Sequence, residues 1–301
     1  MCYDEDAYKM RGVDWTMQRY LAFDVGGTTI KYGIVGADQT ITHRGAMPTE
    51  RNVDSAILKR LIKVTRDIKD QISIEGIGVS TAGIVAADGS IQYAGPTIPD
   101  YQGTPIKAKI EDVAGIPVHV FNDVDAALLG EQAGGVAKGV DDVYCLALGT
   151  GIGGAYSHHG ELFSGVHGLA NSVGYTLYDP KGKTNYEQRA ATLSLQSQLQ
   201  PYATTVIEAF AQAKAGIEPF VKLLTDWAAT VASGLAPIVL LFDPEMLIIG
   251  GAVSKQGDYL LSLLNPALDQ LLPPHFRQTV LKVAALGNDA QLLGSVVPFL
   301  K

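Results

Sequence analysis

Two glycine-rich turns carry side chains that suit phosphate chemistry. Residues 24–29 read DVGGTT and are followed by Lys31, while residues 148–154 read LGTGIGG. Glycine has no Cβ atom, so its backbone N–H group can approach an anion closely. The threonine hydroxyls add hydrogen-bond donors, and the Lys31 ammonium group adds a positive charge. One such turn alone is usually an ordinary tight β-turn, but two of them predict a site for the phosphates of a nucleotide.

Two aspartates stand at the ends of predicted strands. Asp24 ends the strand before the first turn, where a Mg²⁺ ion carried by the nucleotide would meet it through water. Asp123 follows the apolar strand of residues 118–121 and Asn122. A carboxylate there can accept the proton of a hydroxyl group and orient its oxygen toward a phosphoryl group. The same Asn-Asp pair could instead cap the helix that begins near Val124.

Charge and composition exclude several kinds of partner. The chain of 301 residues has 23 lysines and arginines against 31 aspartates and glutamates, a net charge of −8. An acidic chain without a basic block is a poor candidate for binding nucleic acid or an anionic membrane. The N-terminal residues are acidic and lack an apolar core, so they do not resemble a secretory signal. We therefore expect a soluble, cytoplasmic protein with no nucleic-acid or membrane partner.

Cysteines and histidines offer little for a metal site. Cys2 and Cys145 are the only cysteines, so no disulfide framework or cysteine-rich zinc motif can be built. His158, His159 and His167 could form another metal site. The first two fall at a predicted hairpin tip, and surface positions explain all three more simply.

The elements around the turns repeat in two halves. Each glycine turn joins two strands, which distinguishes it from the strand-to-helix turn of a dinucleotide fold. Apolar periodicity predicts further elements. The predicted helices are 54–72, 106–114, 187–199, 204–215 and 219–241, and the predicted strands include 20–25, 31–35, 76–80, 118–121, 143–148, 155–157 and 246–249. Two similar α/β halves that each open with a glycine hairpin indicate a duplicated fold with a cleft between the halves. The uncharged run 227–242 is shorter than a bilayer span and is expected to be a buried helix.

The chain from residue 20 to its end resembles the ROK family of sugar kinases and repressors, within the actin/hexokinase/Hsp70 ATPase superfamily. The resemblance is carried by the segments FDVGGTTIK, GVSTAGIVAADG, VFNDVDAALLGE, LGTGIGGA and DPEMLIIGGAVS. It implies an α/β fold of two RNase H-like, actin-like ATPase domains with an interdomain cleft. The implied division is an extension at 1–18, an N-terminal domain at 19–121 plus 289–301, and a C-terminal domain at 122–288. The last helix, near residues 290–299, would return to the N-terminal domain.

The resemblance also implies roles for individual residues. The implied ATP-binding residues are Asp24, Gly26, Gly27, Thr28, Thr29, Lys31, Gly149, Thr150, Gly151, Gly153, Gly154, Gly250 and Gly251, with the last two against the adenosine. Asp123 is implied to be the catalytic base. The implied sugar-binding residues are Gly83, Thr97, Asn122, Asp123, Ser172, Tyr175 and Glu187. The implied cofactors are ATP and Mg²⁺.

One segment departs from the family pattern. ROK kinases commonly carry AGEIGH and then a cysteine cluster, whose three cysteines bind a structural zinc together with the histidine. Here residues 168–175 read GLANSVGY, so Ser172 replaces the glutamate and Tyr175 replaces the histidine. Residues 179–185, DPKGKTN, replace the cysteine cluster. Without a four-ligand set, the sequence predicts no structural zinc.

The same departures bear on the sugar. Each charge-assisted hydrogen bond lost with the glutamate costs about 1.5–3 kcal/mol if nothing replaces it. Ser172 also leaves room, and some zinc-free relatives such as β-glucoside kinases have tyrosine at the position of Tyr175. A second departure places Thr97 where the family has an asparagine that contacts the sugar. These substitutions favour a glycoside or larger sugar over free glucose, or else indicate weakened affinity.

The sequence thus predicts ATP-dependent phosphorylation of a sugar hydroxyl, the 6-OH of a hexose or β-glucoside. A catalytically weak sugar or nucleotide sensor of the same fold is the alternative. A DNA-binding repressor is disfavoured because the residues before the first hairpin are few and acidic. A chaperone-like or filament ATPase is disfavoured because such proteins lack the STAG and NDVDAALLGE pattern. Family habit implies a homodimer.

Overall fold

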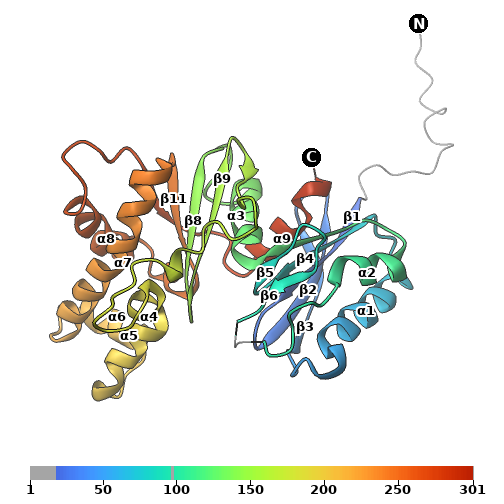
Figure 1. Cartoon of the computed structure of the whole chain (residues 1–301), viewed down its shortest axis with the longest axis horizontal. Helices are drawn as coiled ribbons and strands as arrows, with labels where there is room; N and C mark the ends of the chain where they lie inside the picture. Colours follow the sequence, from blue (N-terminus) through green and yellow to red (C-terminus); the bar gives the residue numbers. More distant parts are fainter. Residues whose placement is uncertain (1–17, 96–97, 301) are drawn as a thin grey trace, which may run out of the picture.

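The computed structural model describes residues 18–95 and 98–300 of the chain. They form two five-stranded sheets with helices beside them, and two further helices lie between the sheets in the middle of the molecule (Figure 1). Residues 1–17 of the expected N-terminal extension lie outside the described residues, and so does Thr97.

The first sheet has the strand order β3-β2-β1-β4-β7. Its strands are β1 (Arg19–Val25), β2 (Thr29–Gly36), β3 (Ile41–Pro48), β4 (Gly76–Thr81) and β7 (Val118–Asn122). β1 and β2 are antiparallel, whereas β1, β4 and β7 are parallel. Every residue of β4 is buried, as expected for a parallel strand that is covered on both faces.

Helices α1 (Ala56–Lys69) and α2 (Ile106–Ala114) cover one face of this sheet. α1 buries Ile57, Leu58 and Leu61 on one side, which is the periodicity that predicted it. Asn52 caps the helix from a distance, because its Oδ1 accepts a hydrogen bond from the N–H group of Ile57 at 3.1 Å. The short hairpin of β5 (Ile84–Val85) and β6 (Ile91–Tyr93) follows β4.

The second sheet has the order β10-β9-β8-β11-β12 and repeats the topology of the first. Its strands are β8 (Val143–Leu148), β9 (Ile152–His158), β10 (Glu161–Leu162), β11 (Met246–Gly250) and β12 (Val280–Val283). Its helices are α4 (Tyr186–Ala190), α5 (Thr192–Leu199), α6 (Val206–Lys214), α7 (Phe220–Phe242) and α8 (Asp258–Asp269). A hairpin therefore opens each sheet and parallel strands complete it, which confirms the predicted duplication.

α7 is the core helix of the second half. Among the described residues it is the one helix long and apolar enough to cross a membrane, and 56% of its most apolar window is buried inside the molecule. Trp227, Val231 and Leu235 are buried in one cluster with Leu146 of β8 and Leu247 of β11. This packing confirms the buried helix expected for the uncharged run 227–242.

Helices α3 (Asp123–Gly134) and α9 (Asp289–Val296) cross between the two sheets. Their backbones touch, because a Cβ atom added to Gly294 would lie 1.7 Å from the carbonyl oxygen of Ala126. α9 also packs on the first sheet, where Leu292 and Val296 are buried with Tyr20 of β1. The C-terminal helix thus lies on the N-terminal sheet, although the exact domain limits remain a prediction.

Several elements differ from the sequence-based expectation. The single helix expected over residues 187–199 is wrong, because Ala191 has an extended ψ of 156° and separates α4 from α5. The break lets the N–H group of Thr192 donate to the carbonyl oxygen of Gly149 at 3.0 Å, a contact with the second glycine turn. Strands β3 and β12 and helix α8 were not expected from the periodicity.

Candidate functional site

The first glycine turn joins β1 to β2 as a tight hairpin. The N–H group of Gly26 donates to the carbonyl oxygen of Thr29 at 3.1 Å. Thr49, which follows β3, donates from its hydroxyl to the Gly26 carbonyl at 2.6 Å and from its N–H group to the Thr28 carbonyl at 2.9 Å. The carbonyl oxygens of Gly26 and Thr28 are thereby bonded to Thr49, while the Thr28 side chain is exposed. This arrangement suits a turn that presents donors to a phosphate.

Asp24 sits beneath this hairpin at the end of β1. Its side chain is buried and accepts a hydrogen bond from the Ser80 hydroxyl at 3.2 Å. The Lys31 ammonium group lies 3.4 Å from the other carboxylate oxygen and 3.4 Å from the side-chain oxygen of Asn288. Burial raises the pKa of Asp24 above its ordinary value, and Lys31 partly opposes that rise. A carboxylate, a hydroxyl and a cation therefore meet at one point below the turn.

The second glycine turn joins β8 to β9 and is supported from α4. The Glu187 carboxylate accepts a hydrogen bond from the Ile152 N–H group at 2.7 Å. A Cβ atom added to Gly151 would lie 2.3 Å from that carboxylate, so the close approach requires glycine. The other expected ATP-binding residues of this half are nearby: Thr150 is exposed in the turn, Gly153 and Gly154 lie in β9, and Gly250 pairs with Ala147 of β8 and is followed by Gly251.

β7 ends at Asn122 and α3 begins at Asp123. Asn122 accepts a hydrogen bond from the Val124 N–H group at 2.8 Å, and its amide donates to the Gly83 carbonyl at 2.8 Å. Asp123 Oδ1 shares the same N–H group at 3.1 Å. Asn122 is therefore the helix cap, which leaves one oxygen of the Asp123 carboxylate outside the capping interaction.

The start of α3 lies between the two glycine hairpins. A Cβ atom added to Gly153 would lie 2.7 Å from the Val124 side chain, which places the second hairpin against the helix. On the other side, Asp123 is close enough to Asp24 for the two charges to interact. Both hairpin turns also lie on the lower side of the molecule in Figure 1. Asp24 and Asp123 are about a hundred positions apart in the sequence, and the fold brings them together at this site.

The environment of Asp123 raises the pKa of its carboxyl group to about 6. Burial is the largest cause, the negative charge of Asp24 is the second, and the hydrogen bonds at the helix start oppose both. A carboxylate with a pKa near neutrality is ionised at pH 7 and still basic enough to accept a proton. Burial and the charge of Asp123 likewise raise the pKa of Asp125 to about 7.

Two tyrosines from different halves of the molecule meet near Gly83 and Glu187. Tyr93 ends β6, and a Cβ atom added to Gly83 would lie 2.6 Å from its carbonyl oxygen. The pKa of Tyr175 is raised by burial, by a hydrogen bond to Tyr93 and by the charge of Glu187. The two residues remain 43% and 60% exposed, and they lie beside the predicted sugar-binding residues Gly83 and Glu187.

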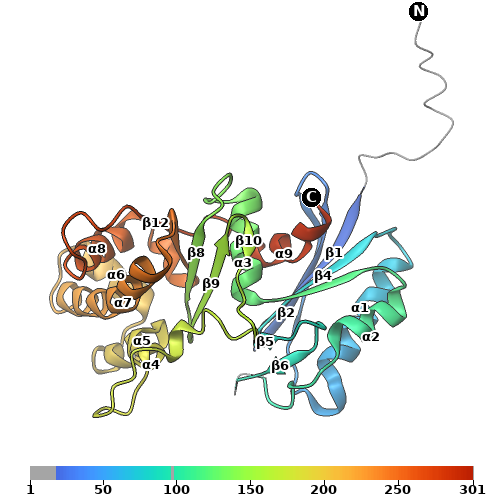
Figure 2. The same ribbon diagram turned by 45° about the horizontal axis from the view of Figure 1, so that its top comes forward.

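The same two segments touch again next to the tyrosines. The Gln92 amide donates to the His167 carbonyl at 3.4 Å. A Cβ atom added to Gly168 would lie 3.6 Å from the Val85 carbonyl oxygen. In Figure 2 the segment after β10 runs down to β5 and β6. The β5–β6 hairpin and the loop after β10 therefore approach each other beside the predicted sugar-binding residues.

Comparison with known proteins decides the family. The ROK family model matches residues 20–300 of the chain. The chain belongs to the ROK family. It is 26% identical to the glucokinase of Thermotoga maritima, covering 92% of this chain and 96% of that one, and 28% identical to the β-glucoside kinase of Listeria monocytogenes, covering 93% and 97%. The crystal structure of a ROK family glucokinase from Streptomyces griseus in complex with glucose and AMPPNP is 27% identical, covers 92% of this chain and 97% of that chain, and has a TM-score of 0.79. The predicted resemblance to ROK sugar kinases and the predicted two-domain α/β fold are confirmed.

Ser172 and Tyr175, which depart from the ROK family pattern, both make contacts within the protein. The Ser172 hydroxyl donates to the Leu169 carbonyl at 2.8 Å, and Tyr175 contacts Tyr93. Tyr93 was not expected from the sequence, because nothing in the local pattern predicts that β6 reaches the loop around Tyr175.

Glu131 of α3 is a buried carboxylate that binds backbone groups. Its side chain is 0% exposed, so it is structural rather than solvated. It accepts hydrogen bonds from the N–H groups of Ala285 and Leu286 at 2.9 and 2.8 Å and from Val136 at 2.9 Å. It thereby ties the end of α3 to the segment that leads into α9.

Proposed function

We propose that this ROK protein transfers the γ-phosphoryl group of ATP to the 6-hydroxyl group of a hexose or β-glucoside. The observation that supports this most strongly is the position of Asp123 between two glycine hairpins, with its pKa raised to about 6. A sensor has no need of a base with that pKa at that place. The ROK sugar kinases that match most of the chain support the same class of reaction.

In the proposed reaction Asp123 accepts the proton of the sugar hydroxyl as its oxygen attacks the γ-phosphorus. The bond between that phosphorus and the bridging oxygen breaks, and ADP leaves. Backbone N–H groups of the two hairpins, the threonine hydroxyls and Lys31 stabilise the charge on the phosphates. Asn122 orients Asp123. It also binds the sugar, through the hydrogen-bonding positions that its bonds to Val124 and Gly83 leave free.

Mg²⁺ fits beside Asp24 through water rather than by direct contact. The two Asp24 oxygens already face Ser80 and Lys31, but hard oxygen donors of this kind bind the water shell that Mg²⁺ tends to keep. The ion supplies neutralisation of the phosphate charge when it is bound. Asp24 supplies an acceptor for its water ligands, and Lys31 provides the adjacent positive charge.

We infer that the sugar carries a substituent. Ser172 in place of a glutamate removes a charged acceptor and leaves space, and Tyr93 with Tyr175 provides aromatic surface beside that space. Aromatic rings bind the apolar faces of sugars and of planar substituents. A β-glucoside satisfies both features, as the similarity to the Listeria β-glucoside kinase also suggests. Gly83 would line the same side of the site.

The test is ADP production with Mg²⁺ and a panel of hexoses, N-acetylhexosamines and alkyl or aryl β-glucosides, with Asp123→Asn beside the wild type. Loss of a positioned base lowers the rate by roughly 10²–10⁴-fold. Asp125→Asn is the matched control, because it removes a neighbouring carboxylate with a raised pKa. The proposal is supported if one sugar class stimulates turnover and Asp123→Asn alone abolishes it. Equal loss in Asp123→Asn and Asp125→Asn contradicts the assignment of Asp123 as the base.

A catalytically weak sugar or nucleotide sensor is the second candidate. One observation favours it: Asn122 and Glu187, two expected sugar ligands, both bind backbone groups of the protein itself. Nucleotide binding without turnover on any sugar would support the sensor. The homodimer and the domain limits stay predictions from the family resemblance, and the cytoplasmic location stays a prediction from the charge and the N-terminal sequence.

A further inference from the structure

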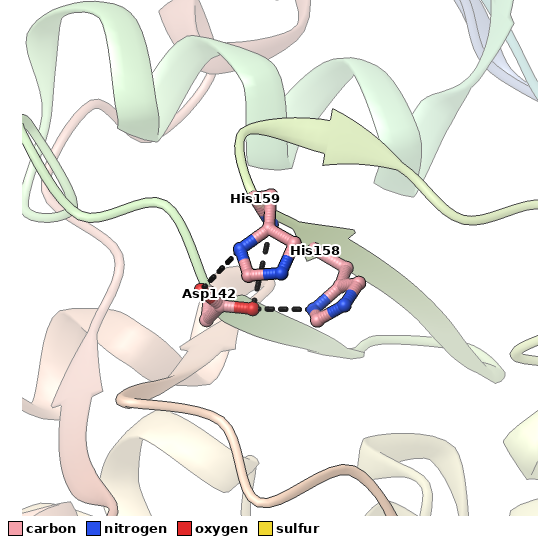
Figure 3. A group of neighbouring side chains, drawn as sticks. All are labelled: Asp142, His158 and His159. Atoms are coloured by element: carbon pink, nitrogen blue, oxygen red, sulfur yellow. Dashed lines mark hydrogen bonds and ion pairs between the residues drawn. The ribbon is translucent and has the colours of Figure 1, made fainter.

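A second cluster of polar side chains lies away from the kinase site. Asp142 immediately precedes β8, His158 ends β9, and His159 begins the turn between β9 and β10. Figure 3 shows both imidazole rings on the same side of the turn as the Asp142 carboxylate. In the described part of the chain, no other group of three His, Cys, Asp or Glu side chains has the spacing to hold a metal ion.

The three side chains converge through atoms that can ligate a metal. His158 Nδ1 lies 2.6 Å from Asp142 Oδ1, and His159 Nδ1 lies 3.7 Å from Asp142 Oδ2. One atom from each residue lies within 4.8 Å of the other two. The two ring centroids are 3.9 Å apart, so the imidazoles stand nearly side by side.

The backbone holds this arrangement in place. His159 has φ 52° and Gly160 has φ 76°, so the turn has two successive left-handed residues. The Gly160 N–H group donates to the Asp141 carbonyl at 3.1 Å, and the His159 N–H group lies 3.4 Å from Asp142 Oδ1. These bonds attach the turn to the start of β8. The cluster is therefore attached to the start of β8 and to the end of β9, which are paired strands of the second sheet.

We propose that Asp142, His158 and His159 bind a divalent transition-metal ion such as Zn²⁺. Two imidazole nitrogens and one carboxylate oxygen form a donor set typical of zinc, and water completes the tetrahedron. Ligand atoms about 2.0–2.1 Å from a tetrahedral zinc lie roughly 3.4 Å from one another. The present separations, 2.6 Å from His158 to Asp142 Oδ1 and 3.7 Å from His159 to Asp142 Oδ2, lie on either side of that value, and each involves a different carboxylate oxygen. Small rotations of three partly exposed side chains are enough to admit the ion.

This metal site is separate from the reaction. β8 runs from Val143 to Leu148, so at about 3.3 Å per residue Asp142 lies roughly 20 Å along the strand from the start of the second glycine turn. It also lies outside the segment of residues 168–185, where ROK kinases commonly have their zinc motif. Bound metal would join the beginning of β8 to the end of β9 and stabilise the edge of the second sheet next to β10.

The experiment titrates Zn²⁺ into the full chain without an affinity tag, by calorimetry and by thermal unfolding. Co²⁺ serves as a coloured probe, because its visible absorption reports tetrahedral nitrogen and oxygen ligands. His158→Ala and His159→Ala each remove one ligand, and Asp142→Asn removes the negative charge of the third. His43→Ala is the matched control, since His43 is also exposed and also has a positive φ of 47°. Asp24→Asn separates this site from any binding at the phosphate hairpin.

We expect one Zn²⁺ per chain, with a melting temperature that rises as Zn²⁺ is added. Each ligand variant should weaken binding by more than about tenfold, while the two controls bind as the wild type does. Because His158 also stacks on Tyr156, His159→Ala is the decisive variant if His158→Ala fails to fold. Equal Zn²⁺ affinity in the wild type and His159→Ala overturns the proposal, as does the absence of a tetrahedral Co²⁺ spectrum.

Discussion

The carboxylate of Glu187 accepts a hydrogen bond from the backbone N–H group of Ile152 at 2.7 Å. This bond connects a predicted sugar ligand on α4 to the turn predicted to hold the nucleotide phosphates. The position of Glu187 therefore bears on both substrates. The same residue lies close enough to Tyr175 to raise the pKa of that phenol.

The first prediction concerns this bond. Glu187→Ala leaves the Ile152 N–H group without its partner and loosens the second hairpin, so KM should rise for ATP as well as for the sugar. Glu187→Gln keeps an acceptor oxygen and should retain the KM for ATP while the KM for the sugar rises. Steady-state kinetics with each substrate varied in turn measures the two effects. A rise in the sugar KM alone in the alanine variant would show that the hairpin does not depend on Glu187.

The second prediction is a pH profile. The base must be ionised, and the pKa of Asp123 is raised to about 6, so kcat/KM should rise with pH through about 6 and then level off. Asp123→Asn should lose this limb together with roughly 10²–10⁴-fold in rate. Asp125→Asn should keep the limb near the same pH. A limb that persists in Asp123→Asn would assign it to another group.

Stability gives an independent check on Asp123. Its pKa is raised on folding, so the stability it contributes is present below its unfolded pKa and is lost as pH rises through about 6. Asp123→Asn removes that ionisation, so it should unfold at a higher temperature than the wild type at pH 8. The difference should shrink as pH falls below 6. Thermal unfolding across this range tests the sign directly.

The third prediction concerns Tyr93 and Tyr175. An aromatic contact contributes about 0.5–1.5 kcal/mol, so alanine at either position should lower kcat/KM for an aryl β-glucoside by roughly 2–13-fold. The value for glucose should change less, because glucose has no substituent to reach the rings. Tyr178→Ala is the control, since Tyr178 is 61% exposed in the same loop. Equal losses with glucose and with the glucoside would contradict the inferred role.

The fourth prediction concerns Glu131. Its removal leaves three backbone N–H groups without their acceptor in a buried environment, at about 1–3 kcal/mol each. Glu131→Ala should therefore lower the free energy of unfolding by several kcal/mol, measured by urea denaturation. Glu161→Ala on the exposed strand β10 should change it by less than about 0.5 kcal/mol. A small effect of Glu131→Ala would mean that water replaces the carboxylate.

The fifth prediction tests the crossing of α3 and α9. A methyl group at Gly294 would lie 1.7 Å from the Ala126 carbonyl oxygen, a backbone atom that cannot rotate away. Gly294→Ala should cost at least about 2 kcal/mol of unfolding free energy. Gly115→Ala has open space and a left-handed φ of 63°, so only about 1–2 kcal/mol of backbone strain is expected. Similar losses in both variants would show that the helices can separate slightly.

Much of the predicted site depends on local pattern. The two glycine hairpins and the strand that ends at Asn122 all come from short-range periodicity and turn chemistry. Such features are encoded within about ten residues, and they appear where they were expected. The prediction that residues 168–185 hold no structural zinc likewise rests on residue types alone. Sequence resemblance added the family, which no periodicity could supply.

Tertiary structure decided the contacts between distant segments. The expected helix 187–199 breaks at Ala191 because Thr192 bonds to the Gly149 turn, a gain that local propensity cannot anticipate. The pairing of Tyr93 with Tyr175 joins residues that are far apart in sequence, and the meeting of Asp142 with His158 depends on the pairing of β8 with β9. Their partners are chosen by how sheets and loops pack, so the sequence by itself determines which side chains are available, and only the folded chain determines which of them meet.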